Sequence, residues 1–198
     1  MESITKLINR SLALPVRALI AATVLSLVLQ TIAQSVLNVF YARSLYPVAY
    51  FVGQTAFDAE KLEGWYRAME EAGTLGVYWQ TQFVDFAFIA ATALLHYWLL
   101  LLITRILPVG RWRRIGLAAL VIGLLAPAFD VLENLVSFIA LSNPTEILPV
   151  TAIVYSSFAS LKFLSFFAVY LWVPVALVAA AVLRIRRSNS SLTTTVTQ

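Results

Sequence analysis

The sequence contains no cysteine and a single histidine, His96. The absence of thiols excludes disulfide bonds, thiolate nucleophiles and zinc–thiolate sites, and one histidine cannot form an all-histidine metal site within a chain. Charged residues are also scarce. They make up 12% of the 198 residues, against about 25% in soluble domains. So few charges cannot cover the surface of a soluble fold of this size.

Apolar residues are abundant instead, at 61% of the chain, compared with about 45–50% in soluble domains. Each of four long apolar runs reaches the ~20 residues that cross ~30 Å of hydrocarbon as a helix. The runs lack the alternation of a barrel strand. We therefore predict an all-α membrane protein, a single four-transmembrane-helix bundle over residues 1–187. The spans are expected at about 18–41, 83–107, 115–141 and 161–183.

The basic residues predict the orientation of the bundle. In a four-span topology, ten of the fourteen basic residues fall on one side: Lys6, Arg10, Arg17, Arg105, Arg111, Arg113, Arg114, Arg184, Arg186 and Arg187. The other side carries most of the acidic residues: Asp58, Glu60, Glu63, Glu70, Glu71 and Glu146. The positive-inside rule then places both termini in the cytoplasm. We expect a multi-pass protein of the bacterial inner (plasma) membrane.

Residues 44–82 form the one sizeable segment outside the spans. Leu62, Tyr66 and Met69 recur there at helical spacing between Asp58 and Gly73, with charges among them. This pattern predicts a short amphipathic helix in the first outer loop, closed by the glycine. The common role of such a helix is a cap over the bundle; a lid or a partner-docking element is the alternative.

Two segments near the fourth span have other predicted structures. A single helix from Pro149 to Leu183 would exceed the bilayer thickness at about 1.5 Å per residue. A bend, a tilted extension or a short interfacial helix is therefore expected near Ser156 and Ser157. The Ser- and Thr-rich residues 188–198 are expected to be a disordered tail.

Polar residues inside the third span are the strongest functional signal. Asp130, Glu133, Asn134 and Ser137 are spaced by three and four residues, so they share one helix face. Asp130 and Glu133 lie about 22 and about 27 Å along the helix from Ile115, in its outer half. Charges within a membrane are costly, so an intramembrane ionisable residue suggests a functional site.

The other three spans place polar groups at a similar depth, so we expect these faces to point inward. They are Gln30, Gln34, Asn38 and Tyr41 in the first span, Asp85, Thr92 and His96 in the second, and Lys162 and Ser165 in the fourth. Three carboxylates and one ammonium would give a net charge of −2 in a low-dielectric place. Either protons neutralise part of that charge, or a cation or cationic ligand completes the site.

From these positions we predict a polar, net acidic pocket that binds a small lipophilic or cationic ligand. Asp130 and Glu133 are the candidate catalytic residues, because paired carboxyls in an apolar cavity can act as general acid and base. The candidate ligand-binding residues are Asp85, Asn134, Lys162, Gln34, Asn38, Gln30, Ser137, Ser165 and His96. No metal ligand set and no cofactor is assigned.

Other functions fit the same residues. Acid/base chemistry on a lipid-like substrate would suit the paired acids, and in span number and buried acids the chain resembles the emopamil-binding and sigma-2-receptor group. Proton- or cation-coupled transport would require an oligomer. A non-catalytic subunit or assembly factor would use the cluster only to fix helix packing. His96, taken alone, is expected to be a hydrogen-bonded core histidine rather than a ligand-binding residue. No motif indicates nucleic-acid binding.

Several motifs together resemble a family of small bacterial four-span membrane proteins. They are Gly53-x-Thr55-x-x-Asp58, the stretch from Gly73 to Tyr78, Asp85-Phe-x-Phe88, Asp130-x-x-Glu133-Asn134 and Ser160-Leu-Lys162. Gly76-Val77 stands where that family has Gly-Arg. The resemblance covers residues 53–162 and implies the four-span layout and the importance of these residues. It implies no reaction.

Overall fold

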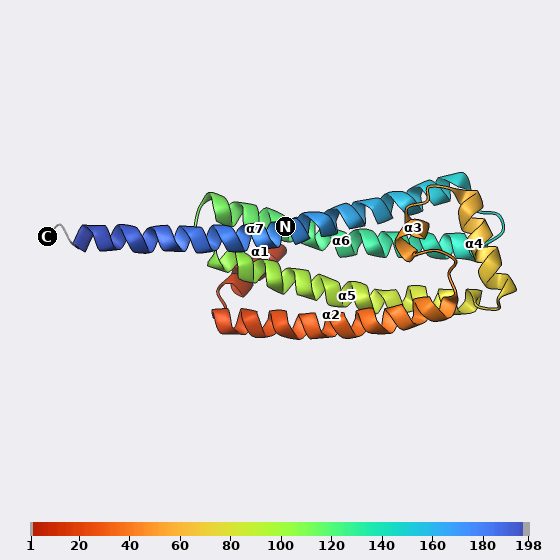
Figure 1. Cartoon of the computed structure of the whole chain (residues 1–198), viewed down its shortest axis with the longest axis horizontal. Coiled ribbons are helices and arrows are strands. Elements are labelled where there is room, and N and C mark those ends of the chain that lie inside the picture. Colours follow the sequence, from red (N-terminus) through yellow and green to blue (C-terminus); the bar gives the residue numbers. More distant parts are fainter. Residues whose placement is uncertain (1, 196–198) are drawn as a thin grey trace.

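The computed structural model describes the backbone of residues 2–195 and the side chains of residues 6–185. Its regular structure in this part of the chain is helical, and four helices are long and apolar enough to cross a membrane, as predicted (Figure 1). The elements are α1 (Glu2–Leu12), α2 (Val16–Ser44), α3 (Tyr50–Gln54), α4 (Ala59–Glu71), α5 (Leu75–Ile106), α6 (Arg111–Ser142) and α7 (Pro149–Thr195).

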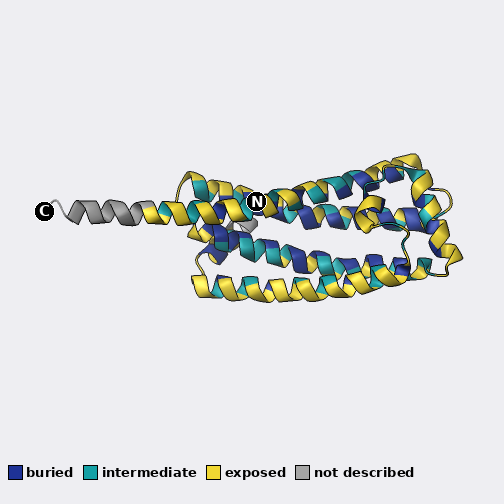
Figure 2. Cartoon of the chain, viewed as in Figure 1, coloured by how far each residue is buried: buried dark blue, intermediate teal, exposed yellow. Residues whose placement is uncertain are grey.

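The four long helices pack in chain order. Extensive contacts join α2 to α5, α5 to α6 and α6 to α7. In the most apolar segments of α5 and α6, 39% of the residues are buried in the protein. In those of α2 and α7, 11% are buried. Figure 2 shows the exposed surface running along the whole of α2. Because these exposed side chains are apolar, α2 and α7 present surfaces suited to lipid.

Two short helices lie at opposite ends of the bundle. α1 contacts α5 near the chain termini, where Ser11 Oγ and Tyr97 OH are 2.8 Å apart. α4 crosses the other end, which we call the α4 end (Figure 1). The sequence did not predict α1 or α3. The backbone of residues 188–195 continues α7, where a disordered tail was expected over residues 188–198, and residues 196–198 lie outside the described part of the chain.

α5 and α7 extend further toward the α4 end than the apolar runs indicated. α5 begins at Leu75 rather than at about Phe83, and α7 is one continuous helix from Pro149 through Ser156. A separate interfacial helix near Ser156 is therefore wrong, and the tilted extension is the alternative that fits (Figure 1). The added turns bury Tyr155 against the cap formed by α4. Protein packing, rather than the bilayer, accounts for these turns.

α4 is the amphipathic helix that the sequence predicted. Asp58 caps its first turn by accepting a hydrogen bond of 3.2 Å from the Lys61 N–H. This bond lowers the pKa of the Asp58 carboxyl because it stabilises the ionised form. Gly73 follows the helix with φ +69°, a backbone conformation that favours glycine. Leu62 and Met69 are fully buried on the face toward the bundle.

Hydrogen bonds from distant parts of the chain hold this end in place. The Ile147 N–H donates to Glu63 Oε1 at 2.7 Å, which ties the α6–α7 loop to α4. The Phe57 N–H donates to Ser156 Oγ at 3.0 Å, which ties the start of α4 to α7. Both bonds cross the end of the bundle, so α4 lies over it in the position expected of a cap, and a role as a lid or partner-docking element stays a prediction.

An aromatic cluster fills the space beneath the cap. The rings of Tyr46 and Tyr78 stack with centroids 5.0 Å apart, and the Tyr66 and Tyr78 centroids are 5.8 Å apart. Burial raises the pKa of Tyr46 and of Tyr66, so both hydroxyls stay protonated at neutral pH. The Tyr46 hydroxyl lies against Gly53, where a β-carbon would sit 2.2 Å from its oxygen.

Replacement of Gly53 tests this packing. In Gly53→Ala the new methyl group overlaps Tyr46, whose ring is held by its stacking on Tyr78. We expect a loss of about 1–3 kcal/mol in the free energy of unfolding, the usual cost of overpacking. Denaturant unfolding in detergent measures this loss. Gly64→Ala on α4 is the matched control, since it meets nothing within 4 Å and should be neutral or stabilising. Equal effects of the two changes would contradict the packing described here.

Candidate functional site

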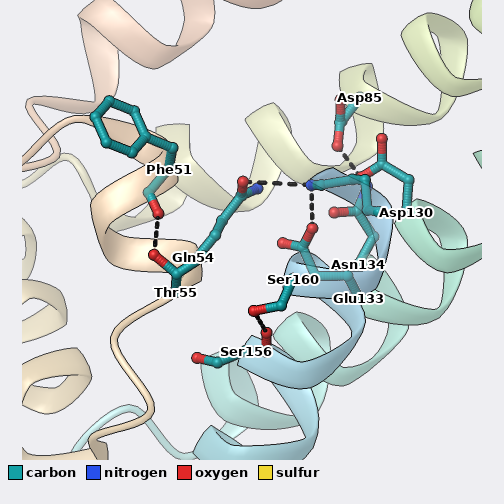
Figure 3. A network of polar contacts seen from close by, with 10 residues as sticks. Phe51, Gln54, Thr55, Asp85, Asp130, Glu133, Asn134, Ser156 and Ser160 are labelled. Atoms are coloured by element: carbon teal, nitrogen blue, oxygen red, sulfur yellow. Dashed lines mark hydrogen bonds and ion pairs between the residues drawn. The ribbon is translucent and has the colours of Figure 1, made fainter. Parts of the chain in front are cut away.

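Lys162 lies at the centre of the buried polar cluster. Its ammonium donates to Asp130 Oδ1 at 2.9 Å and to Glu133 Oε2, both on α6. It also donates to Gln54 Oε1 on α3 at 3.3 Å (Figure 3). Three acceptors match the three N–H groups of an ammonium. Lys162 therefore joins α7, α6 and α3 through one fully satisfied cation.

The third span presents its polar face toward this cation, as the spacing predicted. Asp130, Glu133, Asn134 and Ser137 are all buried. The internal Pro127 lies one turn earlier on α6. Proline removes one helical hydrogen bond, and at such positions in spans the neighbouring groups accommodate the change.

Asp85 has a different environment from the other two acids. Asn134 Nδ2 donates to Asp85 Oδ2 at 2.8 Å (Figure 3). Among residues 6–185, the ion pairs of the cluster use Asp130 and Glu133, and Asp85 has no cationic partner. When all groups are ionised, Lys162 offsets one of the three negative charges. The excess is therefore concentrated at Asp85.

A cavity of about 220 Å³ adjoins Asp85, Asp130 and Lys162. It lies between α2 and α7, the first and last helices of the packing order. Its walls combine three amides with aromatic rings and one leucine. The remaining lining residues are Gln30, Gln34, Leu37, Tyr41, Tyr50, Gln54, Phe88, Phe163, Phe166 and Tyr170.

The sequence-predicted residues divide into three groups around this cavity. Asp85, Asp130, Lys162, Gln30 and Gln34 line it. A second group lies buried in the helix interface and is absent from the lining: Glu133, Asn134 and Ser137. The Oγ of Ser137 and the Oε1 of Glu133 are buried without a hydrogen-bond partner in the described part of the chain.

The third group lies apart from the cavity. Asn38 is exposed on α2, and Gln34 Nε2 donates to its Oδ1 at 2.8 Å. Its inward orientation, expected from the shared face, is therefore not found. His96 is buried and its Nδ1 is 2.7 Å from the Gly123 carbonyl oxygen. Ser165 bonds within its own helix to the Leu161 carbonyl. These contacts fit a structural role for His96 and Ser165.

Tyr41 was expected on the inward face of the first span, whereas Gln54 and the other aromatic residues of the lining were not predicted. Gln54 follows Gly53 in a motif that the sequence singled out, but the segment gave no sign of the helix α3. Phe163 and Phe166 follow Lys162 by one and four residues in the sequence, within a run of apolar residues. Hydropathy alone does not distinguish an aromatic residue that lines a cavity from one that faces lipid. The spacing of Phe163 and Phe166 from Lys162 was the available signal.

A cation of the chain itself already lies between the two paired acids. The Lys162 ammonium occupies the position between Asp130 and Glu133 that a cation would take. Among the residues with described side chains, no group of three or more His, Asp or Glu residues is placed to hold a metal. The chemical capacity of the site is therefore an acidic recess with amide hydrogen-bonding groups and aromatic faces.

Comparison of the chain with protein-family models, with curated proteins and with solved structures found no match. The resemblance to a four-span bacterial family thus rests on the quoted motifs and stays a prediction. Support for a function comes instead from the geometry of the cavity.

Removal of the central cation tests the cluster. Lys162→Met leaves Asp130 and Glu133 buried without a partner, and we expect a loss of about 3–5 kcal/mol, or failure to fold. Thermal unfolding and folding yield in detergent measure the effect. Combining Lys162→Met with Asp130→Asn and Glu133→Gln removes the stranded charges, so stability should recover in large part. A triple variant no better than Lys162→Met would contradict the ion-pair account.

Proposed function

We propose that this protein binds a small amphipathic ligand that carries a cationic group, within the membrane and against Asp85. The observation that supports the proposal is that Asp85 lines the cavity without a cationic partner among the described residues, whereas Asp130 is paired with Lys162. A ligand ammonium would supply the missing partner.

The cost of burying charge explains why a cationic ligand is favoured. Moving a carboxylate from water into the protein interior costs on the order of several kcal/mol of hydration free energy. The single amide hydrogen bond to Asp85 recovers a part of that cost. An opposite charge beside Asp85 would recover more. A proton on Asp85 would also neutralise its charge and would compete with the cationic ligand. Binding of the ligand should therefore weaken as the pH falls and Asp85 becomes protonated.

The walls of the cavity restrict the ligand further. Its volume of about 220 Å³ is smaller than the ~300–1,000 Å³ of sites for drug-sized molecules. The rings of Phe163 and Phe166 line the cavity. Lys162 Nζ already lies 4.9 Å from the centroid of the Phe163 ring, so Phe166 is the ring that would meet a ligand cation or aromatic group. Tyr170 is 65% exposed and Tyr50 is 46% exposed, so the rim lies at the surface between α2 and α7. A ligand can therefore enter from the lipid and leave a hydrophobic tail in the bilayer.

Acid/base chemistry on a lipid-like substrate is a second candidate. The observation that favours it is that Asp85 and Asp130 line one cavity but have different partners, an amide and an ammonium. Carboxyls in different environments can take the separate roles of acid and base. Proton- or cation-coupled transport by an oligomer would use the same groups. A purely structural cluster, as in a non-catalytic subunit, would require no ligand.

We also propose that the end with the chain termini faces the cytoplasm of a bacterial cell. Arginines with described side chains at that end are Arg10, Arg17, Arg105, Arg111, Arg113, Arg114 and Arg184. The acidic residues of α4 lie at the opposite end. The positive-inside rule supports this orientation in the inner membrane, which would put the cavity in the outer half of the bilayer.

Binding of amines tests the function. The probes are a set of lipophilic alkyl- and arylamines, each paired with its neutral alcohol analogue, and native mass spectrometry of the detergent-solubilised protein reports binding. We expect the amines to bind. Asp85→Asn should lower the affinity for them about tenfold or more, since a hydrogen bond to a charged group contributes about 1.5–3 kcal/mol. Asp85→Asn retains the acceptor for Asn134, so the fold should persist.

The control is Ser35→Ala, because Ser35 is exposed on α2 outside the cavity and its hydroxyl donates to the Thr31 carbonyl of its own helix. It should bind the amines as the unchanged protein does. Equal binding of amines and alcohols, or equal affinities with and without the Asp85 carboxylate, would contradict the proposal. A cluster with only a structural role would alter thermal stability in the variants and bind neither class of probe.

A further inference from the structure

A second pocket lies at the end of the bundle that carries the chain termini. Its volume is about 730 Å³, larger than the cavity beside Asp85. Residues from the end of α5 and its following loop form one side, and residues of α7 form the other. The lining residues are Val16, Arg105, Ile106, Leu107, Pro108, Val109, Leu177, Ala180, Ala181, Leu183 and Arg184.

Two arginines from different helices line this pocket. Arg105 lies in the last turn of α5, and Arg184 lies on α7. Among residues 6–185, neither arginine takes part in an ion pair. A guanidinium presents several donors in a plane and pairs well with phosphate oxygens. The two side chains therefore provide an unneutralised site for an anion.

The rest of the lining is apolar, and its side chains are small or exposed enough to leave a groove. Ala180 and Ala181 are small, and Leu177 and Val109 expose 47% and 82% of their surfaces. A free phosphate ion would gain nothing from such walls, whereas an acyl chain would bury apolar surface against them. The combination of two cations and an apolar groove at the end of a span suits a lipid headgroup with its chains attached.

We propose that this pocket binds an anionic phospholipid, with its phosphate held by Arg105 and Arg184 and an acyl chain laid along Ala180, Ala181 and Leu177. The site is separate from the cavity beside Asp85, and its ligand has the opposite charge. Occupation of this pocket would hold α5 and α7 together at the level of the headgroups.

Retention of lipid by the purified protein tests the proposal. Delipidated protein is offered phosphatidylglycerol, phosphatidylcholine or inorganic phosphate, and native mass spectrometry counts the bound species. Phosphatidylglycerol should be retained in preference to phosphatidylcholine. Arg105→Gln and Arg184→Gln should each weaken it about fivefold, the equivalent of ~1 kcal/mol per basic residue. Raising the salt concentration should weaken it further.

Two further variants separate a built site from general charge attraction. Arg114→Gln removes a charge at the same end without touching the pocket, so retention should be unchanged. Ala181→Leu keeps every charge and fills the groove, so retention should fall as it does for the arginine variants. Equal losses in Arg114→Gln, or no loss in Ala181→Leu, would overturn the proposal. Arginine-dependent retention of inorganic phosphate without phosphatidylglycerol would overturn the lipid assignment.

Discussion

The buried ion pairs of Lys162 with Asp130 and Glu133, called the ion triad below, are the interaction on which the arrangement of this bundle depends. One ammonium contacts acceptors on α6 and α3, and its contact with Gln54 joins elements that lie far apart in the sequence. Burial of these charges costs several kcal/mol per ion, on the order of the net stability of a whole domain. The surrounding helices must therefore hold a geometry that satisfies the cation. That requirement leaves Asp85, which lines the same cavity, without a cationic partner among the described residues.

The cap and the cavity follow from the same constraint. α3 brings Gln54 to Lys162, and the close approach of Tyr46 to Gly53 holds α3 against the aromatic cluster beneath α4. The α4 end is thus filled by packed side chains where it meets the ion triad. The gap between α2 and α7 is bounded instead by exposed rings. Access from the lipid, rather than through the cap, is the route that this difference favours.

The helix-forming pattern of the sequence was sufficient for the spans and for much of the polar cluster. Asp130, Glu133 and Asn134 recur at intervals that force one shared face, and only Lys162 was placed to meet them. Contacts outside the spans were not accessible in the same way. The extra turns of α5 are stabilised by packing against α4, which hydropathy does not report. Asn38 shares a face of α2 with Gln34 by its spacing, yet Gln34 is half-buried and Asn38 is exposed. The spacing alone does not show where along α2 this face leaves the protein interior.

The central claim is that the cavity between α2 and α7 has an excess of negative charge that attracts cations. Because the chain has no cysteine, a single introduced thiol reports one position. The most direct measurement is the ratio of modification rates by cationic and anionic methanethiosulfonate reagents at Gln34→Cys, compared with Ser35→Cys, which is exposed on α2 outside the cavity. We predict a ratio about tenfold or more higher at position 34, which falls when Asp85 is changed to Asn. The same ratio at both positions would contradict the claim.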